Sequence, residues 1–412
     1  MTSAFNWGKD GSFMASMHQT PSGERIHIAF FGRRNAGKSS LVNAFTGQTL
    51  SIVSPVEGTT TDPVSKAMEL APVGPVQIID TAGLDDVGTL GQLRIDRSYQ
   101  ILNKTDLAIL VTDATRPWDS TEDALLKRIQ EKGIPYLVVR NKADLLSQIP
   151  NDDGFYVSAK TGFHIHELKE LAAELVKQAA TPLPLVGDLL SPGDLVVLVI
   201  PIDKAAPKGR LILPQQQVIR DILDMGACAL VCRDTELTAT MQKLSAPPKL
   251  VITDSQVFGT VNNLLPDHVP LTSFSILMAR HKGILPQAVA GANAVFTLQN
   301  GDKVLISEGC THHRQCGDIG TQKIPNLIRK VTGTQPDFSF TSGGSFPEDV
   351  SGYKLVIHCG GCMLSQREMA FRMGCCGDQN VPVTNYGVLI AHLNGILRRS
   401  VEPIPEIPPF GD

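Results

Sequence analysis

Cysteine and histidine side chains gather in two short segments of the last third of the chain. They form C-x-H at residues 310–312 and H-C-x-x-C at residues 358–362. The two-residue gap lets Cys359 and Cys362 face one metal centre, and Cys310 can join them if the fold brings its loop close. Three thiolates with one further ligand suit a [4Fe–4S] cluster or a Cys₃His zinc site. The glycines of HCGGC favour the cluster, because backbone must approach its sulfides closely.

The other cysteines are interpreted without a metal. Cys228 and Cys232 lie in the apolar run GACALVCR, which predicts core positions on a strand. Cys375 and Cys376 are adjacent, and adjacent cysteines rarely chelate one metal together, so we expect a structural role. Cys316 stays open as a fourth ligand.

A second kind of chemistry is indicated by GRRNAGKSS at residues 32–40, which matches G-x-x-x-x-G-K-[ST] between a predicted strand and a predicted helix. Backbone N–H groups of such a loop bind phosphates. Lys38 is expected to neutralise β- and γ-phosphate oxygens, and the Ser39 hydroxyl to ligate Mg²⁺. The predicted nucleotide contacts in this loop are Gly32, Asn35, Ala36, Gly37, Lys38, Ser39 and Ser40.

Two further segments are predicted to respond to the γ-phosphate. DTAG at residues 80–83 ends a strand, where Asp80 would hold the Mg²⁺ shell and the Gly83 N–H could sense the phosphate. EGTTTDP at residues 57–63 lies where a first switch belongs. Thr60 is the preferred hydroxyl, with Thr59 and Thr61 as alternatives.

The base pocket is predicted from NKAD at residues 141–144 and SAK at residues 158–160. A carboxylate at Asp144 can accept two N–H bonds from guanine, which adenine cannot supply. Asn141 lies near the base and Lys142 along its ring. Ser158, Ala159 and Lys160 complete the pocket, so the sequence predicts GTP and GDP as ligands.

These motifs need a sheet to position them. Short apolar runs alternate with amphipathic stretches, which predicts α/β domains with a doubly wound, mostly parallel N-terminal sheet. A Pro/Gly-rich linker and a second α/β block follow. The predicted organisation is a tail at 1–24, a nucleotide-binding domain at 25–180, a linker at 181–194, a middle domain at 195–266 and a C-terminal domain at 267–412. We find no internal repeat in the sequence.

Composition limits the partners. The net charge of −4 and the lack of Lys/Arg-dense runs argue against nucleic acid. Apolar runs stay far below the roughly 20 residues of a membrane span. A cytoplasmic location is therefore expected.

By their motifs, residues 25–178 resemble the translation-factor-like GTPases, nearest to the tRNA-modification and ribosome-assembly branch with its GTTxD switch. The resemblance implies GTP hydrolysis. Some GTPases orient the attacking water with a glutamine just after the DTAG-type motif. Leu84 stands there, so slow hydrolysis is expected. In potassium-activated members of this branch a P-loop asparagine helps to hold K⁺, and Asn35 in the same place implies stimulation by K⁺.

The cysteine segments behind a GTPase and a middle α/β block make the chain, from about 25 to 405, resemble the [FeFe]-hydrogenase maturation GTPases, the HydF family. The resemblance implies a GTPase domain, a dimerisation domain that forms a homodimer, and a cluster-binding domain. It implies a scaffold that carries a transient di-iron subcluster precursor, with two radical-SAM maturases and apo [FeFe]-hydrogenase as partners. Carried over, Cys310, Cys359 and Cys362 would ligate a [4Fe–4S] cluster, with His312 and His358 beside it.

The fourth ligand stays open between Asp318, His312, His358, Cys316 and water. Two other functions are alternatives. An RNA- or ribosome-assembly-associated GTPase with a zinc module is disfavoured by the acidic charge. A metalloenzyme whose cluster does the chemistry lacks a radical-SAM-type C-x₃-C-x₂-C run.

Overall fold

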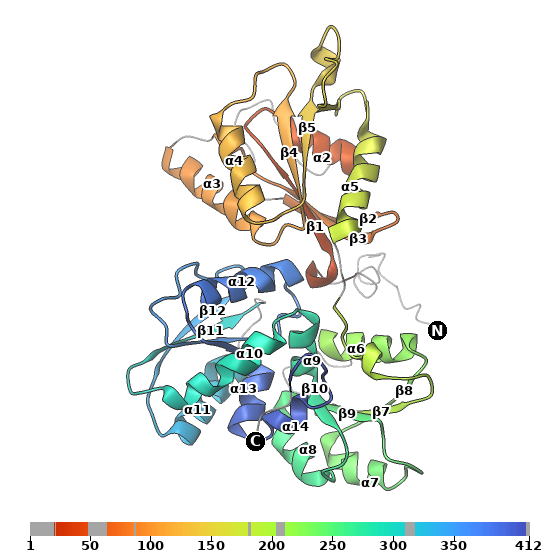
Figure 1. The fold of residues 1–412 in the computed structure, drawn as a ribbon, viewed down its shortest axis with the longest axis vertical. Coiled ribbons are helices and arrows are strands. Elements are labelled where there is room, and N and C mark those ends of the chain that lie inside the picture. Colours follow the sequence, from red (N-terminus) through yellow and green to blue (C-terminus); the bar gives the residue numbers. More distant parts are fainter. Residues whose placement is uncertain are drawn as a thin grey trace, which may run out of the picture. The chain divides into compact units, whose positions relative to one another are not determined.

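The computed structural model describes residues 20, 22–47, 64–85, 88–179, 183–202, 211–309 and 318–408. They belong to two compact units, Met1–Ala179 and Ala180–Asp412, whose elements are labelled in Figure 1. Thr60 of the predicted switch, Cys310, His312, Cys316 and most of the predicted tail lie outside the described residues.

The first unit is built on one mixed sheet. Its strand order is β2-β3-β1-β4-β5-β6, in which β2 is antiparallel to β3 and the other pairs are parallel. The prediction of a doubly wound, mostly parallel sheet is confirmed. The elements are β1 (Ile26–Phe31), α2 (Lys38–Thr46), β2 (Val64–Leu70), β3 (Gly74–Asp80), α3 (Gly88–Leu102), β4 (Leu107–Asp113), α4 (Ser120–Glu131), β5 (Tyr136–Asn141), β6 (Phe155–Tyr156) and α5 (Ile165–Ala179).

The central strands of this sheet are buried on both faces. Ile28 and Phe30 of β1 pack in the core that also holds side chains of α2 and α5. Ala29 and Phe31 pack in the opposite core with side chains of α3 and α4. Alternate residues of one apolar strand thus serve two helical layers, as a buried parallel sheet requires.

The second unit contains two parallel sheets, with strand orders β10-β9-β7-β8 and β12-β11-β13-β14. The first sheet is built from β7 (Leu195–Val199), α6 (Leu213–Asp224), β8 (Cys228–Cys232), α7 (Leu237–Met241), β9 (Leu250–Thr253), α8 (Phe258–Leu264) and β10 (Leu271–Ser273), followed by α9 (Phe274–His281) and α10 (Leu285–Gly291). The second is built from β11 (Lys303–Glu308), α11 (Ile324–Thr332), β12 (Asp337–Ser342), β13 (Leu355–His358), α12 (Gln366–Asp378) and β14 (Val383–Asn385), followed by α13 (Tyr386–Leu393) and α14 (Leu397–Val401).

These two sheets repeat one topology. In each, the first strand along the chain pairs with the second on one side and with the third on the other, and the fourth strand lies outside the third. The sequence repeats with them: KLVI occurs at 249–252 and 354–357, and VPLTSF at 269–274 matches VPVTNY at 381–386. The expectation of no internal repeat was wrong, because the matching stretches are short and the loops between them differ in length.

Matching backbone contacts support the repeat. The Asp194 carboxylate accepts from the Ser191 N–H at 2.8 Å, and Asp302 accepts from the Gln299 N–H at the same distance. The Lys249 N–H donates at 2.8 Å to the carbonyl oxygen of the first residue of β7, and the Lys354 N–H donates at 2.8 Å to that of the first residue of β11. Equivalent strands therefore begin in equivalent hydrogen-bonded turns.

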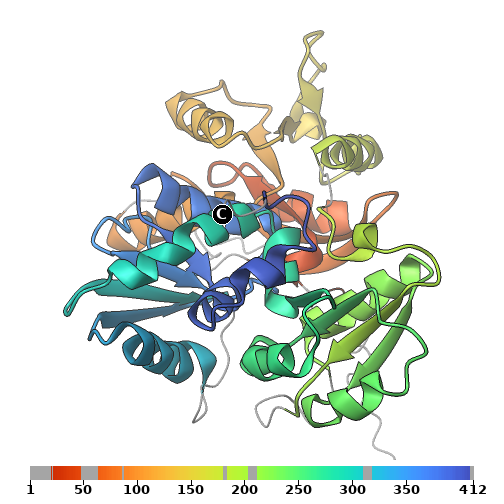
Figure 2. The ribbon, with the colours of Figure 1, turned by 60° about the horizontal axis from the view of Figure 1, so that its bottom comes forward.

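The two repeats are interleaved. Helix α10 follows the first sheet but packs on β14, and α14 follows the second sheet but packs on β10. The approach is close: a Cβ on Gly291 of α10 would lie 2.1 Å from the carbonyl oxygen of Val383 in β14. Figures 1 and 2 show the helices that follow β10 and β14 between the two sheets.

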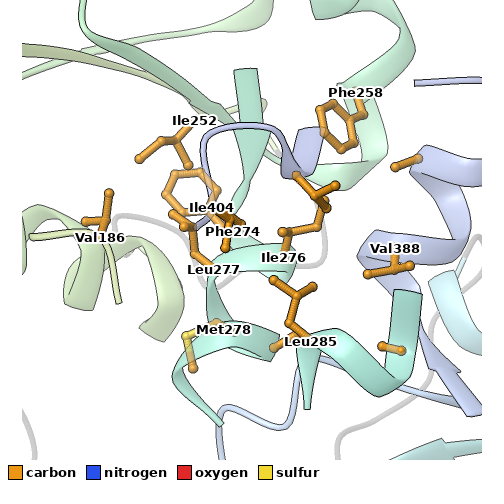
Figure 3. Packing of buried hydrophobic residues seen from close by; sticks show 14 of the residues in the cluster. Val186, Ile252, Phe258, Phe274, Ile276, Leu277, Met278, Leu285, Val388 and Ile404 are labelled. Atoms are coloured by element: carbon orange, nitrogen blue, oxygen red, sulfur yellow. The ribbon is translucent and has the colours of Figure 1, made fainter. Parts of the chain in front are cut away.

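One continuous core results. It joins Ile252 and Phe258 of the first repeat to Val388 and Val401 of the second. Figure 3 shows Leu285 and Val388 within this packing. Gly395, at φ +72°, ends α13 and separates it from α14, so the last helical stretch of the chain forms two helices. Gly283, at φ +74°, does the same between α9 and α10.

Strand β8 corrects one cysteine prediction. It is one of the two edge strands of its sheet, and Cys228 is exposed while Cys232 is buried. An edge strand has one unpaired side and less cover, so an apolar run there does not make every residue core. Among the helices of the described residues, none is long and apolar enough to cross a membrane.

Candidate functional site

The loop between β1 and α2 has the geometry of a phosphate-binding loop. Gly32 has φ +146°, and a Cβ there would lie 2.1 Å from the carbonyl oxygen of Val111. The Lys38 side chain is buried, and its Nζ donates to the carbonyls of Gly32 at 3.0 Å and Arg33 at 2.7 Å. The loop therefore wraps around the ammonium group at the N-terminus of α2, where anions bind.

The other residues predicted in this loop lie on the same turn. Ala36 is buried, Ser39 and Ser40 are half-buried in the first turn of α2, and Asn35 is exposed with φ +59°. Gly37 has φ +84°, and a Cβ there would lie 2.3 Å from the Asn141 side chain. Glycine at 37 is thus required by the neighbouring base-pocket segment as well as by the turn.

Asn141 joins the predicted base pocket to the phosphate loop. Its amide donates to the carbonyls of Ala36 at 3.0 Å and Gly37 at 3.4 Å, and its carbonyl accepts from the Ala159 N–H at 3.1 Å. The side chain is 2% exposed. NKAD, SAK and the P-loop, far apart in the sequence, are therefore brought together through one amide.

Two of the predicted base-recognition side chains, Asp144 and Lys142, are positioned by polar contacts within the domain. The Ser158 hydroxyl donates to Asp144 at 2.6 Å, and Lys142 forms an ion pair with Asp113 at 2.6 Å. Burial acts to raise the pKa of Asp113, but the hydrogen bonds from Lys142 and Thr115 and the charge of Lys142 outweigh it and lower that pKa. Asp144 and Lys160 are exposed at this edge of the sheet.

DTAG lies against the phosphate loop. Asp80 is buried at the end of β3, and the Thr81 hydroxyl donates to the Phe30 carbonyl at 2.7 Å. A Cβ on Gly83 would lie 2.4 Å from Cγ of Arg34. Leu84 is 5% exposed and packs in the core under α3 and α4, so the side chain at the position of a catalytic glutamine faces away from solvent.

An ion-pair network at this loop was not predicted. Asp85 accepts from the Arg34 N–H at 2.6 Å and from Nε of Arg33 at 3.2 Å. Arg33 also pairs with Asp119, the residue that caps α4. Nothing in the spacing of these residues indicates the contact, because the arginines follow β1 while Asp85 follows β3 and Asp119 follows β4.

The second site lies at the carboxyl edge of the sheet that contains β11 and β13. These strands are parallel neighbours, with Ser307 opposite His358. The strand order reverses between them, and ligands of open α/β sheets bind at such a switch point. The Gly309 N–H donates to Sγ of Cys359 at 3.1 Å. The segment that continues to Cys310 thus starts beside Cys359.

Two backbone N–H groups donate to the Cys359 sulfur. It accepts a second bond from the Gly361 N–H at 3.4 Å. Gly361 has φ +67°, and a Cβ there would lie 2.7 Å from the Met369 sulfur. Burial raises the pKa of Cys359, and the two N–H bonds act in the opposite direction by favouring the thiolate. Cys362 is half-buried on the same loop.

His358 is buried completely, and both of its ring nitrogens have partners. Nδ1 lies 2.9 Å from the Cys359 carbonyl oxygen, and Nε2 lies 3.0 Å from a guanidinium nitrogen of Arg372. Burial and then Arg372 lower the pKa of His358 to about 3, so the ring is neutral, donates through Nδ1 and accepts through Nε2. It could bind iron only by giving up one of these bonds.

Arg372 of α12 is the buried cation of this edge, and sequence reasoning missed it. It donates to Glu368 at 2.6 Å, to the Gly343 carbonyl at 2.6 Å and to the Ser307 hydroxyl at 3.4 Å. Its partners come from the ends of β11, β12 and β13 and from α12 itself. No metal-type spacing marks an arginine, so the motif search had no signal for it.

Other polar groups border the same edge. The Tyr386 hydroxyl donates to Glu308 at 3.2 Å, and burial raises the pKa of Tyr386. Asp318 accepts from the N–H and hydroxyl of Thr321, both at 2.8 Å, and so caps the next helical turn. Within the described residues there is no group of three His, Cys, Asp or Glu side chains suited to a metal. The predicted third thiolate, Cys310, lies outside them.

Comparison with known proteins places the first unit. Residues 27–142 match a family model described as a 50S ribosome-binding GTPase. The tRNA modification GTPase MnmE of Synechococcus sp. (strain RCC307) is 35% identical over 151 residues, covering 36% of this chain and 33% of that protein. The GTPase Der of Nitratidesulfovibrio vulgaris (strain Hildenborough) is 32% identical over 179 residues, covering 39% and 36%. The chain thus spans about a third of the length of these curated relatives.

Among solved structures, Era of Aquifex aeolicus bound to GDP·AlF₄⁻ aligns with 20% identity and a TM-score of 0.34, covering 50% of this chain and 92% of that one. The first unit carries a P-loop GTPase domain, which agrees with GTP or GDP and Mg²⁺ as its ligands.

The second unit decides the family. Residues 185–283 match the hydrogen maturase F dimerization domain, and residues 286–403 match the hydrogen maturase F tetramerization domain. The chain belongs to the hydrogen maturase F family. Both hydrogen maturase F models describe oligomerization domains, which indicates an oligomeric protein. They meet between α9 and α10, so the boundary cuts through the end of the first repeat.

Proposed function

We propose that this chain is a GTP-hydrolysing scaffold that holds a [4Fe–4S] cluster and assembles and delivers a di-iron precursor to apo [FeFe]-hydrogenase. Membership of the hydrogen maturase F family and the P-loop GTPase domain support a GTPase with a role in hydrogenase maturation. The proposed cluster ligands are Cys310, Cys359 and Cys362. The proposed partners are the hydrogenase and two radical-SAM maturases.

One contact carries the cluster proposal. The Gly309 N–H donates to Cys359 Sγ at 3.1 Å, so the residue that precedes Cys310 in the chain lies beside Cys359 although the two are distant in sequence. N–H···S bonds from Gly309 and Gly361 favour a thiolate, as cluster ligands require. The environment of Cys359 supports an iron–sulfur centre at this loop, which when bound would supply an iron-based platform for the cargo.

Residues around this loop are candidates for the fourth ligand of the proposed centre. With His358 and Arg372 bonded to each other, the fourth position of the proposed centre is left to Asp318, His312, Cys316 or water. An exchangeable fourth ligand would suit a carrier, because a bridging group of the incoming cargo could occupy it.

In the GTPase domain we propose that Lys38 and Ser39 act on the phosphates and Mg²⁺, and that Asp144 selects guanine. Thr60, Asp80 and Gly83 are proposed to respond to the γ-phosphate. Because Leu84 cannot hydrogen-bond to an attacking water, turnover is slow, and Asn35 helps K⁺ to stimulate it. Equal turnover in NaCl and KCl buffers would contradict the potassium step.

The deciding experiment is anaerobic purification with iron, sulfide and zinc analysis and an EPR spectrum. About four irons per chain, lost together in a Cys359→Ala/Cys362→Ala variant but retained in Cys228→Ala, supports the proposal. Stoichiometric zinc without iron would favour a GTPase with a zinc module. Transfer is then tested by activating apo [FeFe]-hydrogenase with chain that was isolated after co-expression with both maturases.

A further inference from the structure

A single buried guanidinium ties together the strand ends around the cysteine loop. Arg372 is 1% exposed, and its partners follow three adjacent strands. It contacts Ser307 near the end of β11, Gly343 just after β12, and His358 at the end of β13. The other ring nitrogen of His358, Nδ1, lies 2.9 Å from the Cys359 carbonyl oxygen.

The first repeat of the same unit provides an internal comparison. By the KLVI match, His358 corresponds to Thr253 and Cys359 to Asp254. By the matched turns at Asp194 and Asp302, Ser307 corresponds to Val199. The helix after β9, α8, has the sequence FGTVNNL and contains no arginine.

The arginine, the histidine and the serine are therefore absent at the equivalent positions of the repeat that has no H-C-x-x-C segment, although its sheet has the same topology. The strand core is retained in both copies, as KLVI shows. The fold itself does not need this polar cluster, so its presence beside Cys359 calls for a role connected with the cysteine loop.

We propose that Arg372 is a positioning residue for the iron site, which fixes the Cys359 segment through His358 and places a positive charge beneath the bound centre. The inference rests on the proposed cluster-binding function. His358 then serves as a bridge between the guanidinium and the loop backbone.

Two effects follow. Groups that orient metal ligands typically contribute about 10–100-fold to metal affinity. A nearby cation also favours the more negative, reduced state of a cluster, and charge around the centre is one of the levers that set its potential. Glu368 lies 2.6 Å from Arg372 and neutralises part of its charge, so both residues would influence the potential of the centre.

The test compares Arg372→Gln and Arg372→Lys with the matched variants Arg280→Gln and Arg280→Lys. Arg280 is also buried in the same unit, but its ion-pair partners are Asp188 and Glu406, neither of which belongs to the cysteine loop. Far-UV circular dichroism checks folding. Iron content after reconstitution and desalting, and the midpoint potential followed by EPR, report on the centre. The alkylation rate of Cys359 in iron-free protein, mapped by mass spectrometry, reports on the loop.

For Arg372→Gln we expect iron affinity to fall by about tenfold or more, the potential of the remaining centre to become more negative, and Cys359 alkylation to accelerate several-fold. Arg372→Lys keeps the charge but not the fork, so the potential stays closer to wild type while affinity falls. The Arg280 variants should leave all three readouts near wild type.

Folded Arg372→Gln protein with wild-type iron affinity, potential and alkylation rate would overturn the inference. If Arg372→Gln does not fold, Arg372→Lys decides, and wild-type iron affinity in that variant would be the contrary result. Wild-type protein that takes up no iron would instead contradict the proposed function. The alkylation comparison would still decide whether Arg372 positions the loop.

Discussion

Interleaving of the two repeats predicts that the second unit unfolds cooperatively although two family models divide it. Leu285 is the sharpest probe, because it is fully buried in α10, which follows the first sheet and packs on β14 of the second. Leu285→Ala removes a side chain from the continuous core shown in Figure 3. Buried Leu→Ala substitutions cost about 3–5 kcal/mol.

A loss of about 3 kcal/mol or more corresponds to at least about 100-fold in an equilibrium constant. Native-state hydrogen exchange should therefore show about 100-fold faster exchange for the slowest amides of β7 and equally for those of β11. Leu41→Ala, at a fully buried position of the GTPase core, is the control. It should accelerate exchange in β1 and leave β7 and β11 unchanged.

The reasoning is refuted if Leu285→Ala accelerates exchange in peptides of one sheet only. That outcome would mean that the sheets open separately and that the contact of α10 with β14 contributes little. Two calorimetric transitions for residues of the second unit, of which only one moves in Leu285→Ala, would lead to the same conclusion.

Three further predictions concern single side chains. Asn141→Ala removes three hydrogen bonds made by a buried side chain. At about 1 kcal/mol per bond it should destabilise the GTPase domain by about 3 kcal/mol and weaken GDP binding. Asn103→Ala, which loses one exposed bond to Lys132, should change urea unfolding little. Gly37→Ala should abolish nucleotide binding in a fluorescent-GDP titration, because its Cβ would lie 2.3 Å from the Asn141 side chain at φ +84°, and wild-type affinity would contradict this. The pKa of His358 is about 3 in the folded protein, against an ordinary value of 6.5, so between these pH values the unfolded chain binds a proton that the folded protein does not. The contribution of His358 to the free energy of unfolding is therefore complete above pH 6.5 and is lost as the pH falls toward 3. His358→Gln should flatten that part of the stability–pH curve, and an unchanged slope would argue against a neutral buried ring.

The sequence predicted the main elements and motifs of the GTPase domain because each is encoded locally. Apolar runs such as IHIAFF and LAILVTD became β1 and β4, and the P-loop, DTAG, NKAD and SAK segments meet at one edge. The roles assigned to their residues stay predictions. What local patterns could not show is how the segments are joined, since Asn141 spans three of them through one side chain.

In the second unit, short elements escaped prediction. Strands β10 and β14 have three residues each, too few for an alternation pattern. Pairwise comparison of the two halves would have found them, because VPLTSF and VPVTNY contain both strands and the starts of both following helices. The repeat was visible in the sequence, but only to a search that tolerates loops of unequal length.

The comparison of the repeats separates what the fold needs from what the site needs. Both copies keep the KLVI strand, the capped helix after the fourth strand, and the glycine that ends it, at Gly283 and Gly395. They differ at the carboxyl edge, where Val199 and Thr253 in one copy stand against Ser307 and His358 in the other. Strand interiors are constrained by packing on both faces, whereas loops at a switch point are free to carry ligands. An edge that carries buried charge in one copy only, beside the cysteines, is therefore where function has been added to a shared scaffold.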